Sequence, residues 1–132
     1  MERTLFIVKP DGVARKLVGE IVSRFEKRGF AIIQMKMLTF SRAQAEEFYS
    51  VHKERPFYGE LVNFMISGPV VAAIIEGTNA IGTTRMMVGA TKPSDATSGT
   101  IRGDLAIDIS SNIIHASDSQ ESFDKESKVV FG

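Results

Sequence analysis

Several short apolar runs along the chain predict buried strands. Residues 4–8 read Thr-Leu-Phe-Ile-Val and are followed by Lys-Pro-Asp-Gly, so we expect a strand that ends in a turn. Residues 70–75 are apolar at every position, which is typical of a central strand buried on both faces. Residues 30–40 predict a further strand, in which Gln34 and Lys36 share one partly exposed face.

Other segments have the 3.6-residue period of amphipathic helices. Apolar residues at 18, 21, 22 and 25 lie on one helical face, and Gly29 supplies a C-terminal cap. Ser41 with Gln44 forms a capping box that predicts a short helix through Tyr49. Further helices are expected around Leu61–Met65, from Asn79 to near Gly89, and from Asp118, which has Glu121 three residues on.

Residues 90–118 show no periodicity, and a stretch this long without a regular pattern is often functional. Residues 129–131 (Val-Val-Phe) predict a terminal strand. In chain order these elements predict an α+β fold of the ferredoxin-like type, with a four-stranded, mainly antiparallel sheet and helices on one face. We expect residues 1–132 to form a single domain.

Composition narrows the classes of function. Sixteen basic residues balance sixteen acidic ones, whereas a non-specific nucleic-acid binder normally has a basic excess. The chain has no cysteine, which excludes disulfides and cysteine-based zinc sites. No signal peptide is evident, and no apolar run approaches the roughly 20 residues that span a bilayer. We therefore expect a cytoplasmic protein that binds no membrane and no specific nucleic acid.

His115 is the strongest candidate for a reactive group. It lies in the polar stretch Asn-Ile-Ile-His-Ala-Ser-Asp-Ser at residues 112–119, and the chain has only one other histidine, His52. At neutral pH an imidazole is largely uncharged and has a lone pair for attack. A carboxylate on the other ring nitrogen would fix its tautomer, and Glu126, with Ser117 orienting it, could supply that carboxylate. The alternative is a structural histidine held by a backbone carbonyl.

Phosphate would have to be held without a Walker A motif, because no segment matches one. Lys9 stands at a strand end, and Arg102 lies in a glycine-flanked loop where a guanidinium can grip phosphate oxygens. Each has an alternative: Lys9 as a surface lysine, and Arg102 as a partner of Asp104. Arg85 and Thr91 are weaker candidates. Exposed helical arginines are common, and Thr91 could merely cap the end of the loop.

A base could stack on Phe57, which a proline turn presents, although aromatic residues are more often part of a core. His52 has no matching ligand set, so we expect a surface histidine.

Five segments together resemble the nucleoside diphosphate kinase family from one end of the chain to the other. The segment around His115 is the most specific of them. In chain order the segments are Val8-Lys9-Pro10-Asp11-Gly12, Arg55-Pro56-Phe57, Ser67-Gly68-Pro69-Val70-Val71, Thr97 with Gly99-Thr100-Ile101-Arg102-Gly103-Asp104, and Asn112-Ile113-Ile114-His115-Ala116-Ser117-Asp118-Ser119.

The resemblance implies a catalytic role for His115, which would accept the γ-phosphate of a nucleoside triphosphate on Nδ1 and pass it to a diphosphate. Glu126 and Ser117 would orient the ring, and Lys9 would approach the sugar hydroxyls and phosphates. Stacking without hydrogen bonds to base edges would give broad base specificity. The remaining nucleotide contacts implied are Arg85, Arg102 and Thr91 for phosphates, Tyr49 beside Lys9, Asn112 for the ribose 3′-hydroxyl, and Phe57, Leu61 and Ile109 for the base.

The resemblance also implies a cofactor and an assembly. Mg²⁺ would arrive on the nucleotide phosphates, with Asp118 near enough to reach it. Family members are homo-oligomers. The loop at Lys92-Pro93 favours a hexamer, although the short C-terminus leaves a tetramer or dimer open. Ala116 stands where the family usually has glycine, and we expect activity to survive this difference.

Two other classes of function compete with the kinase. A phosphohistidine carrier for a protein partner would need His115 but not Phe57, Asn112 or Arg102. A non-catalytic ferredoxin-like domain would form no phosphoprotein at all.

Overall fold

The sheet of the protein has four antiparallel strands. In the computed structural model, which describes residues 1–132, they are β1 (Glu2–Val8), β2 (Ala31–Leu38), β3 (Val70–Gly77) and β4 (Ile114–Ala116). They lie in the order β2-β3-β1-β4, and every pair is antiparallel. This arrangement confirms the predicted α+β fold with a four-stranded sheet.

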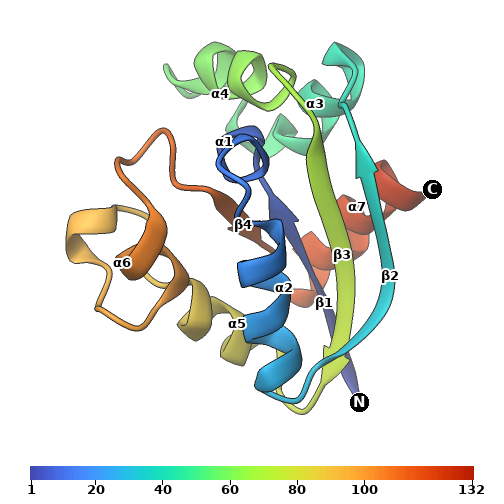
Figure 1. The fold of residues 1–132 in the computed structure, drawn as a ribbon. Coiled ribbons are helices and arrows are strands. Elements are labelled where there is room, and N and C mark those ends of the chain that lie inside the picture. Colours follow the sequence, from blue (N-terminus) through green and yellow to red (C-terminus); the bar gives the residue numbers. More distant parts are fainter.

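Seven α-helices connect and cover these strands (Figure 1). Two short 3₁₀ turns, η1 (Ser50–His52) and η2 (Pro93–Asp95), complete the structure. The helices are α1 (Pro10–Ala14), α2 (Val18–Lys27), α3 (Arg42–Phe48), α4 (Tyr58–Met65), α5 (Ala80–Val88), α6 (Ile101–Leu105) and α7 (Gln120–Phe131).

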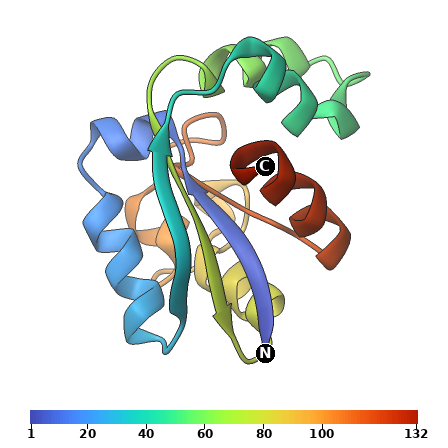
Figure 2. The same cartoon turned by 90° about the vertical axis from the view of Figure 1, so that its right-hand side faces the viewer.

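The helices cover both faces of the sheet, so the expectation of helices on one face is wrong. Figure 2 shows the sheet between α2 on one side and α7 on the other. Successive side chains of a strand point to opposite faces, and β1 is apolar on both: Phe6 and Val8 belong to one buried cluster, Leu5 and Ile7 to the other. Each face therefore needs its own layer of helices.

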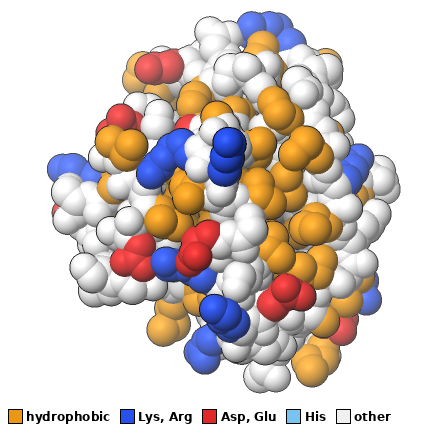
Figure 3. Space-filling view, in the orientation of Figure 1, with side chains coloured by type: hydrophobic (Ala, Val, Ile, Leu, Met, Phe, Trp, Pro, Cys, Tyr) orange, Lys and Arg blue, Asp and Glu red, His pale blue; other side chains and the backbone are white.

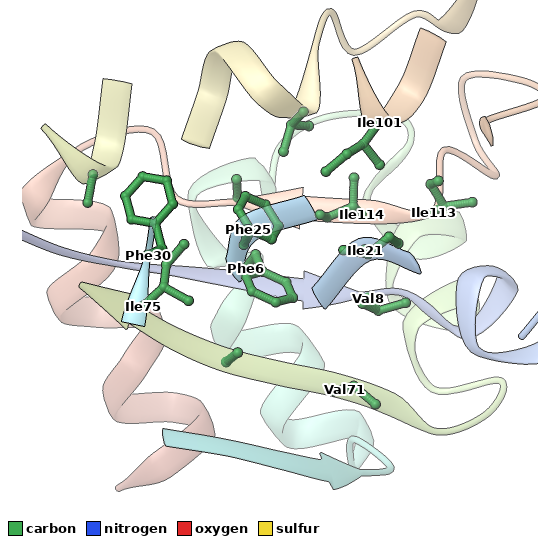
Figure 4. Close-up of a cluster of buried hydrophobic side chains, with 14 residues drawn as sticks. Phe6, Val8, Ile21, Phe25, Phe30, Val71, Ile75, Ile101, Ile113 and Ile114 are labelled. Carbon is green, nitrogen blue, oxygen red and sulfur yellow. The ribbon is translucent and has the colours of Figure 1, made fainter. Parts of the chain in front are cut away.

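The first cluster includes residues of α2, α5 and α6, and Figure 4 shows Ile113 at one end of it. The second cluster includes residues of α3, α4 and α7. Phe6 and Phe25 stack in the first cluster with ring centroids 4.5 Å apart.

Local signals account for several helix ends, and a distant residue caps one. Gly29 adopts φ 102° after α2, which is the left-handed cap that the sequence predicts. The capping box of Ser41 and Gln44 is present at the start of α3. Asn79 precedes α5 as predicted, but its side chain makes no cap. Instead, the carboxylate of Glu2 reaches from β1 and accepts the N–H of Ile81 at 2.7 Å.

The C-terminal prediction is wrong in one respect. Residues 129–131 are the last turn of α7 and not a strand. As part of this helix, Val130 packs into the second cluster, with Val129 and Phe131 partly buried against it. Helix α7 begins at Gln120 because Ser119, and not Asp118, accepts the N–H of Ser122.

The region without periodicity, residues 90–118, contains real elements that are too short to show a period. They are η2, α6 and the three-residue strand β4. None of the helices is long and apolar enough to cross a bilayer.

Candidate functional site

His115 is the middle residue of β4 and pairs with Ile7 of β1. Its side chain is 20% exposed. The ring lies edge-on against Phe48 of α3, with centroids 5.0 Å apart, and 6.4 Å from the ring of Tyr49. The pairing of β4 with the interior strand β1 and the two aromatic neighbours therefore fix the ring, and part of it stays exposed to solvent.

The carboxylate of Glu126 holds the ring from α7. Nε2 of His115 lies 2.8 Å from Oε1 of Glu126, and the hydroxyl of Ser117 donates to the same oxygen at 2.6 Å. A carboxylate can only accept, so Nε2 carries the proton. The lone pair is then on Nδ1, for which the protein supplies no hydrogen-bond partner. The ring is therefore in the tautomer that a nucleophile needs, and not held by a backbone carbonyl.

Lys9 follows β1 directly and is buried, so it is not a surface lysine. Its ammonium donates to Oδ1 of Asn112 at 2.9 Å. The amide of Asn112 in turn donates to the carbonyl of Thr91 at 3.2 Å. Burial, together with the neighbouring guanidinium of Arg102, lowers the pKa of Lys9 to about 8.

Arg102, on α6, is 4% exposed and donates only to backbone carbonyls. Its Nη2 lies 2.6 Å from the oxygen of Ile114, and its Nη1 lies 3.2 Å from that of Gly89. Burial lowers its pKa to about 10. The predicted alternative, a pair with Asp104, is wrong: Asp104 binds Arg24 at 2.9 Å.

Neither Lys9 nor Arg102 forms an ion pair with a carboxylate. Two cations held in the interior without a carboxylate partner are costly to the fold. A bound anion would relieve that cost, so this arrangement suits a phosphate ligand.

A strained turn joins Asn112 to the strand that carries His115. Ile113 has φ 61°, which is rare for a β-branched residue, and the N–H of Ile114 donates to the oxygen of Asn112 at 2.8 Å. We call residues 112–114 the Ile113 turn. Sequence reasoning missed it, because nothing in the residue types at 112–114 indicates a positive φ.

Asp11 also escaped the sequence reasoning as a member of the site. Its Oδ2 accepts the N–H of Ile113 at 3.1 Å, and its Oδ1 is buried without a partner. Burial raises the pKa of Asp11. The predicted turn after β1 is in fact helix α1, which carries Asp11 to this position.

Three residues predicted to contact phosphate or magnesium lie at the exposed margin of the site. Arg85 of α5 is exposed and donates to the oxygen of Ala116 at 3.2 Å. Thr91 is exposed. Asp118 is exposed, and a hydrogen bond from Ser122, 2.6 Å long, lowers its pKa. Ala116 is buried without positive φ, so alanine fits its position without backbone strain.

The residues expected to contact the nucleotide base differ in their surroundings. Phe57 precedes α4 and is 45% exposed. Leu61, on α4, packs partly against the second cluster. Ile109 is 59% exposed in the loop after α6. His52 is partly exposed, and its ring lies 5.7 Å from that of Phe57.

Tyr49 is the remaining predicted residue, and it is buried with its hydroxyl unpartnered. Burial raises its pKa above the ordinary value, and the charge of Glu126 adds to the rise. An orphaned hydroxyl within reach of the charge of the buried Arg102 is a polar group that a ligand could satisfy.

Comparisons with known proteins agree on one family. The family model described as "Nucleoside diphosphate kinase" matches residues 2–132. A nucleoside diphosphate kinase of Picrophilus torridus is 56% identical over 131 residues, which covers 99% of this chain and 95% of the relative.

Solved structures agree. The apo nucleoside diphosphate kinase of Encephalitozoon cuniculi superposes with a TM-score of 0.98 at 39% identity, covering 100% of this chain and 90% of that one. A halophilic nucleoside diphosphate kinase of Halobacterium salinarum, solved with CDP, gives a TM-score of 0.95 at 42% identity, covering 98% and 87%.

Proposed function

The chain belongs to the nucleoside diphosphate kinase family, and on that premise we propose that it transfers phosphate in two steps through a phosphohistidine on His115. The γ-phosphate of a nucleoside triphosphate would move first to the ring and then to a nucleoside diphosphate. One nucleotide site would serve both substrates in turn, which is a ping-pong reaction.

The observation that carries this proposal is the hydrogen-bonded group of His115, Glu126 and Ser117. In the first step the lone pair on Nδ1 forms a bond to the γ-phosphorus. The bond from that phosphorus to the β,γ-bridging oxygen breaks, and the diphosphate leaves with its electron pair. The Nε2 proton stays on the ring, where Glu126, 2.8 Å away, stabilises the positive charge that develops.

Phosphoryl transfer depends mainly on in-line placement and on positive charge around the moving group. Lys9 and Arg102 supply that charge from the interior, and Arg85 supplies it from the margin, with Thr91 adding a hydroxyl. Lys9, Tyr49 and Asn112 would bind the ribose side. The hydrogen bond from Lys9 to Asn112, 2.9 Å long, already holds two of these groups together.

Phe57 would stack on the base, with Leu61 and Ile109 beside it. Stacking contacts the face of any base and reads no edge, so we expect broad base specificity. The exposure of Phe57 supports this role, because a phenylalanine serving only the core would be buried.

Magnesium would bind as part of the substrate. The chain has no group of three His, Cys, Asp or Glu side chains that could hold a metal by itself. Phosphate oxygens of the nucleotide must therefore supply most of the ligands, with the exposed carboxylate of Asp118 available beside them. Bound magnesium would neutralise part of the phosphate charge.

We further propose a homo-oligomer, with a hexamer favoured over a tetramer or dimer. Edge strand β2 exposes Met35 by 48% and Met37 by 61%, and Figure 3 shows apolar side chains gathered on the face that carries β2 and β3. An edge with exposed apolar side chains favours association. The cytoplasmic location expected from the sequence stays a prediction.

A labelled-phosphate chase tests the proposal. The protein is mixed with γ-labelled ATP, freed of nucleotide and then given GDP. We expect label on the wild-type protein that leaves as GTP, and none on His115→Ala. Label that stays on the protein would support the carrier instead, and an unlabelled wild type would contradict a phosphohistidine.

A further inference from the structure

The Ile113 turn needs support from its surroundings. A β-branched residue at φ 61° is strained, and such geometry persists only where neighbouring groups fix it. The turn matters because Asn112 begins it and His115 follows it by one residue. Any relaxation of Ile113 would change the separation between the Asn112 amide and the His115 ring.

Three residues hold the turn. The N–H of Lys9 donates to the oxygen of Ile113 at 2.8 Å. Arg102 donates to the oxygens on either side, to Ile114 at 2.6 Å and to Asn112 at 3.4 Å. Asp11 alone holds the N–H of Ile113, through Oδ2 at 3.1 Å.

Helix α1 packs directly against the Ile113 turn. A Cβ at Gly12 would lie 3.0 Å from the oxygen of Ile113 and 2.7 Å from Cγ1 of Val8, so only glycine allows this approach. Figure 4 shows the side chain of Ile113 at the edge of the first buried cluster. The turn is therefore enclosed between α1 and the core.

The carboxylate of Asp11 costs stability as it stands, because Oδ1 is buried without a hydrogen bond. Fold stability alone therefore does not explain why an acid occupies this position. The hydrogen bond that Oδ2 accepts from the strained Ile113 amide is a specific explanation.

We propose that Asp11 is a positioning residue for phosphoryl transfer: its Oδ2 fixes the Ile113 turn, and the turn sets Asn112 and His115 at the separation that one nucleotide requires. The inference rests on the proposed function, since it assumes that Asn112 binds the ribose and that His115 takes the phosphate. Asp11 itself touches no substrate.

Asp11→Ala removes the acceptor and frees the turn. We expect the rate of His115 phosphorylation at saturating ATP to fall roughly ten- to hundred-fold, the size expected when reacting groups are displaced by about 1 Å. The KM for ATP should change much less, because Phe57, Arg85 and Thr91 lie outside the turn. Asp11→Asn keeps an oxygen that accepts the Ile113 N–H, so it should restore most of the rate.

A second donor separates positioning from a general loss of stability. With 3′-deoxyATP the ribose lacks the hydroxyl assigned to Asn112, so the effect of Asp11→Ala should shrink. A merely structural role would slow both donors by the same factor. Glu2→Ala is the matched control, because it also removes a carboxylate that accepts a remote backbone N–H, at the other end of β1; it should leave the rate unchanged.

The outcomes distinguish the two proposals. Wild-type protein that takes no phosphate from ATP would contradict the proposed function. Active wild type together with a folded Asp11→Ala of equal rate would overturn the inference, as would equal slowing with both donors. If Asp11→Ala does not fold, Asp11→Glu replaces it, since the extra methylene displaces the acceptor; a wild-type rate in that variant would overturn the inference as well.

Discussion

At the scale of single residues, the site is characterised by two buried cationic side chains, Lys9 and Arg102. Lys9 and Arg102 have lowered pKa values because burial disfavours their charge; the charge of Arg102 adds to the effect at Lys9, and that of Arg85 adds to it at Arg102. A phosphate between them would reverse both effects. Such an anion favours the charged form of Lys9 and moves its pKa back toward the ordinary value.

Nucleotide binding should therefore take up a proton above neutral pH. At pH 8.5 the free Lys9, with a pKa of about 8, is mostly neutral, whereas in the complex it is charged. At pH 6.5 it is charged in both states, and no uptake is expected from it. Calorimetry of nucleotide binding in buffers of different ionisation enthalpy measures the difference. Uptake at pH 8.5 that persists unchanged in Lys9→Gln would contradict this account.

Phe57→Ala tests the proposed stacking. We expect weaker binding of ADP, GDP and CDP alike, by the roughly 1–3 kcal/mol typical of base stacking on an aromatic side chain. Equilibrium dissociation constants for the three diphosphates provide the measurement. Loss of affinity for one base only would show that Phe57 takes part in reading base edges, against the broad specificity proposed.

At the scale of secondary-structure elements, β4 and α7 together position His115, the proposed nucleophile. β4 has only three residues, yet its pairing with β1 places His115 opposite Ile7. α7 then returns Glu126 to the ring, eleven residues later in the chain. The sequence allowed this contact to be predicted, because His115, Ser117 and Glu126 lie close together along the chain.

Elements that depend on distant partners could not be predicted in the same way. Val129, Val130 and Phe131 have strand-forming side chains, but packing of α7 on the second cluster makes them helical. β4 is too short to show a two-residue period, and the left-handed backbone of Ile113 is imposed by Lys9 and Asp11, about a hundred residues away.

Helix α5 offers a test at this scale, because its N-terminus is capped from another element. Glu2→Ala removes the carboxylate on the N–H of Ile81 and should lower the free energy of unfolding by about 1 kcal/mol, the usual value of a lost helix cap. Urea unfolding measures it. Glu47→Ala, at an exposed position of α3, is the control. Equal unfolding midpoints for Glu2→Ala and wild type would contradict the assigned cap.

At the scale of the whole molecule, the exposed apolar side chains of β2 are the clearest sign of self-association. Met35→Glu with Met37→Glu would place two charges on that strand, and we expect a smaller assembly by light scattering. Val51→Glu, at a position 74% exposed on η1, should keep the wild-type mass. An unchanged mass in the double variant would show that β2 takes no part in assembly.

The central claim is that the phosphate is carried on Nδ1 of His115. It is tested most directly by nuclear magnetic resonance of protein with ¹⁵N-labelled histidine after reaction with ATP and magnesium. The account predicts phosphorus coupled to Nδ1 of His115, with Nε2 still protonated toward Glu126. Phosphorus on Nε2, on His52 or on a serine hydroxyl would contradict it.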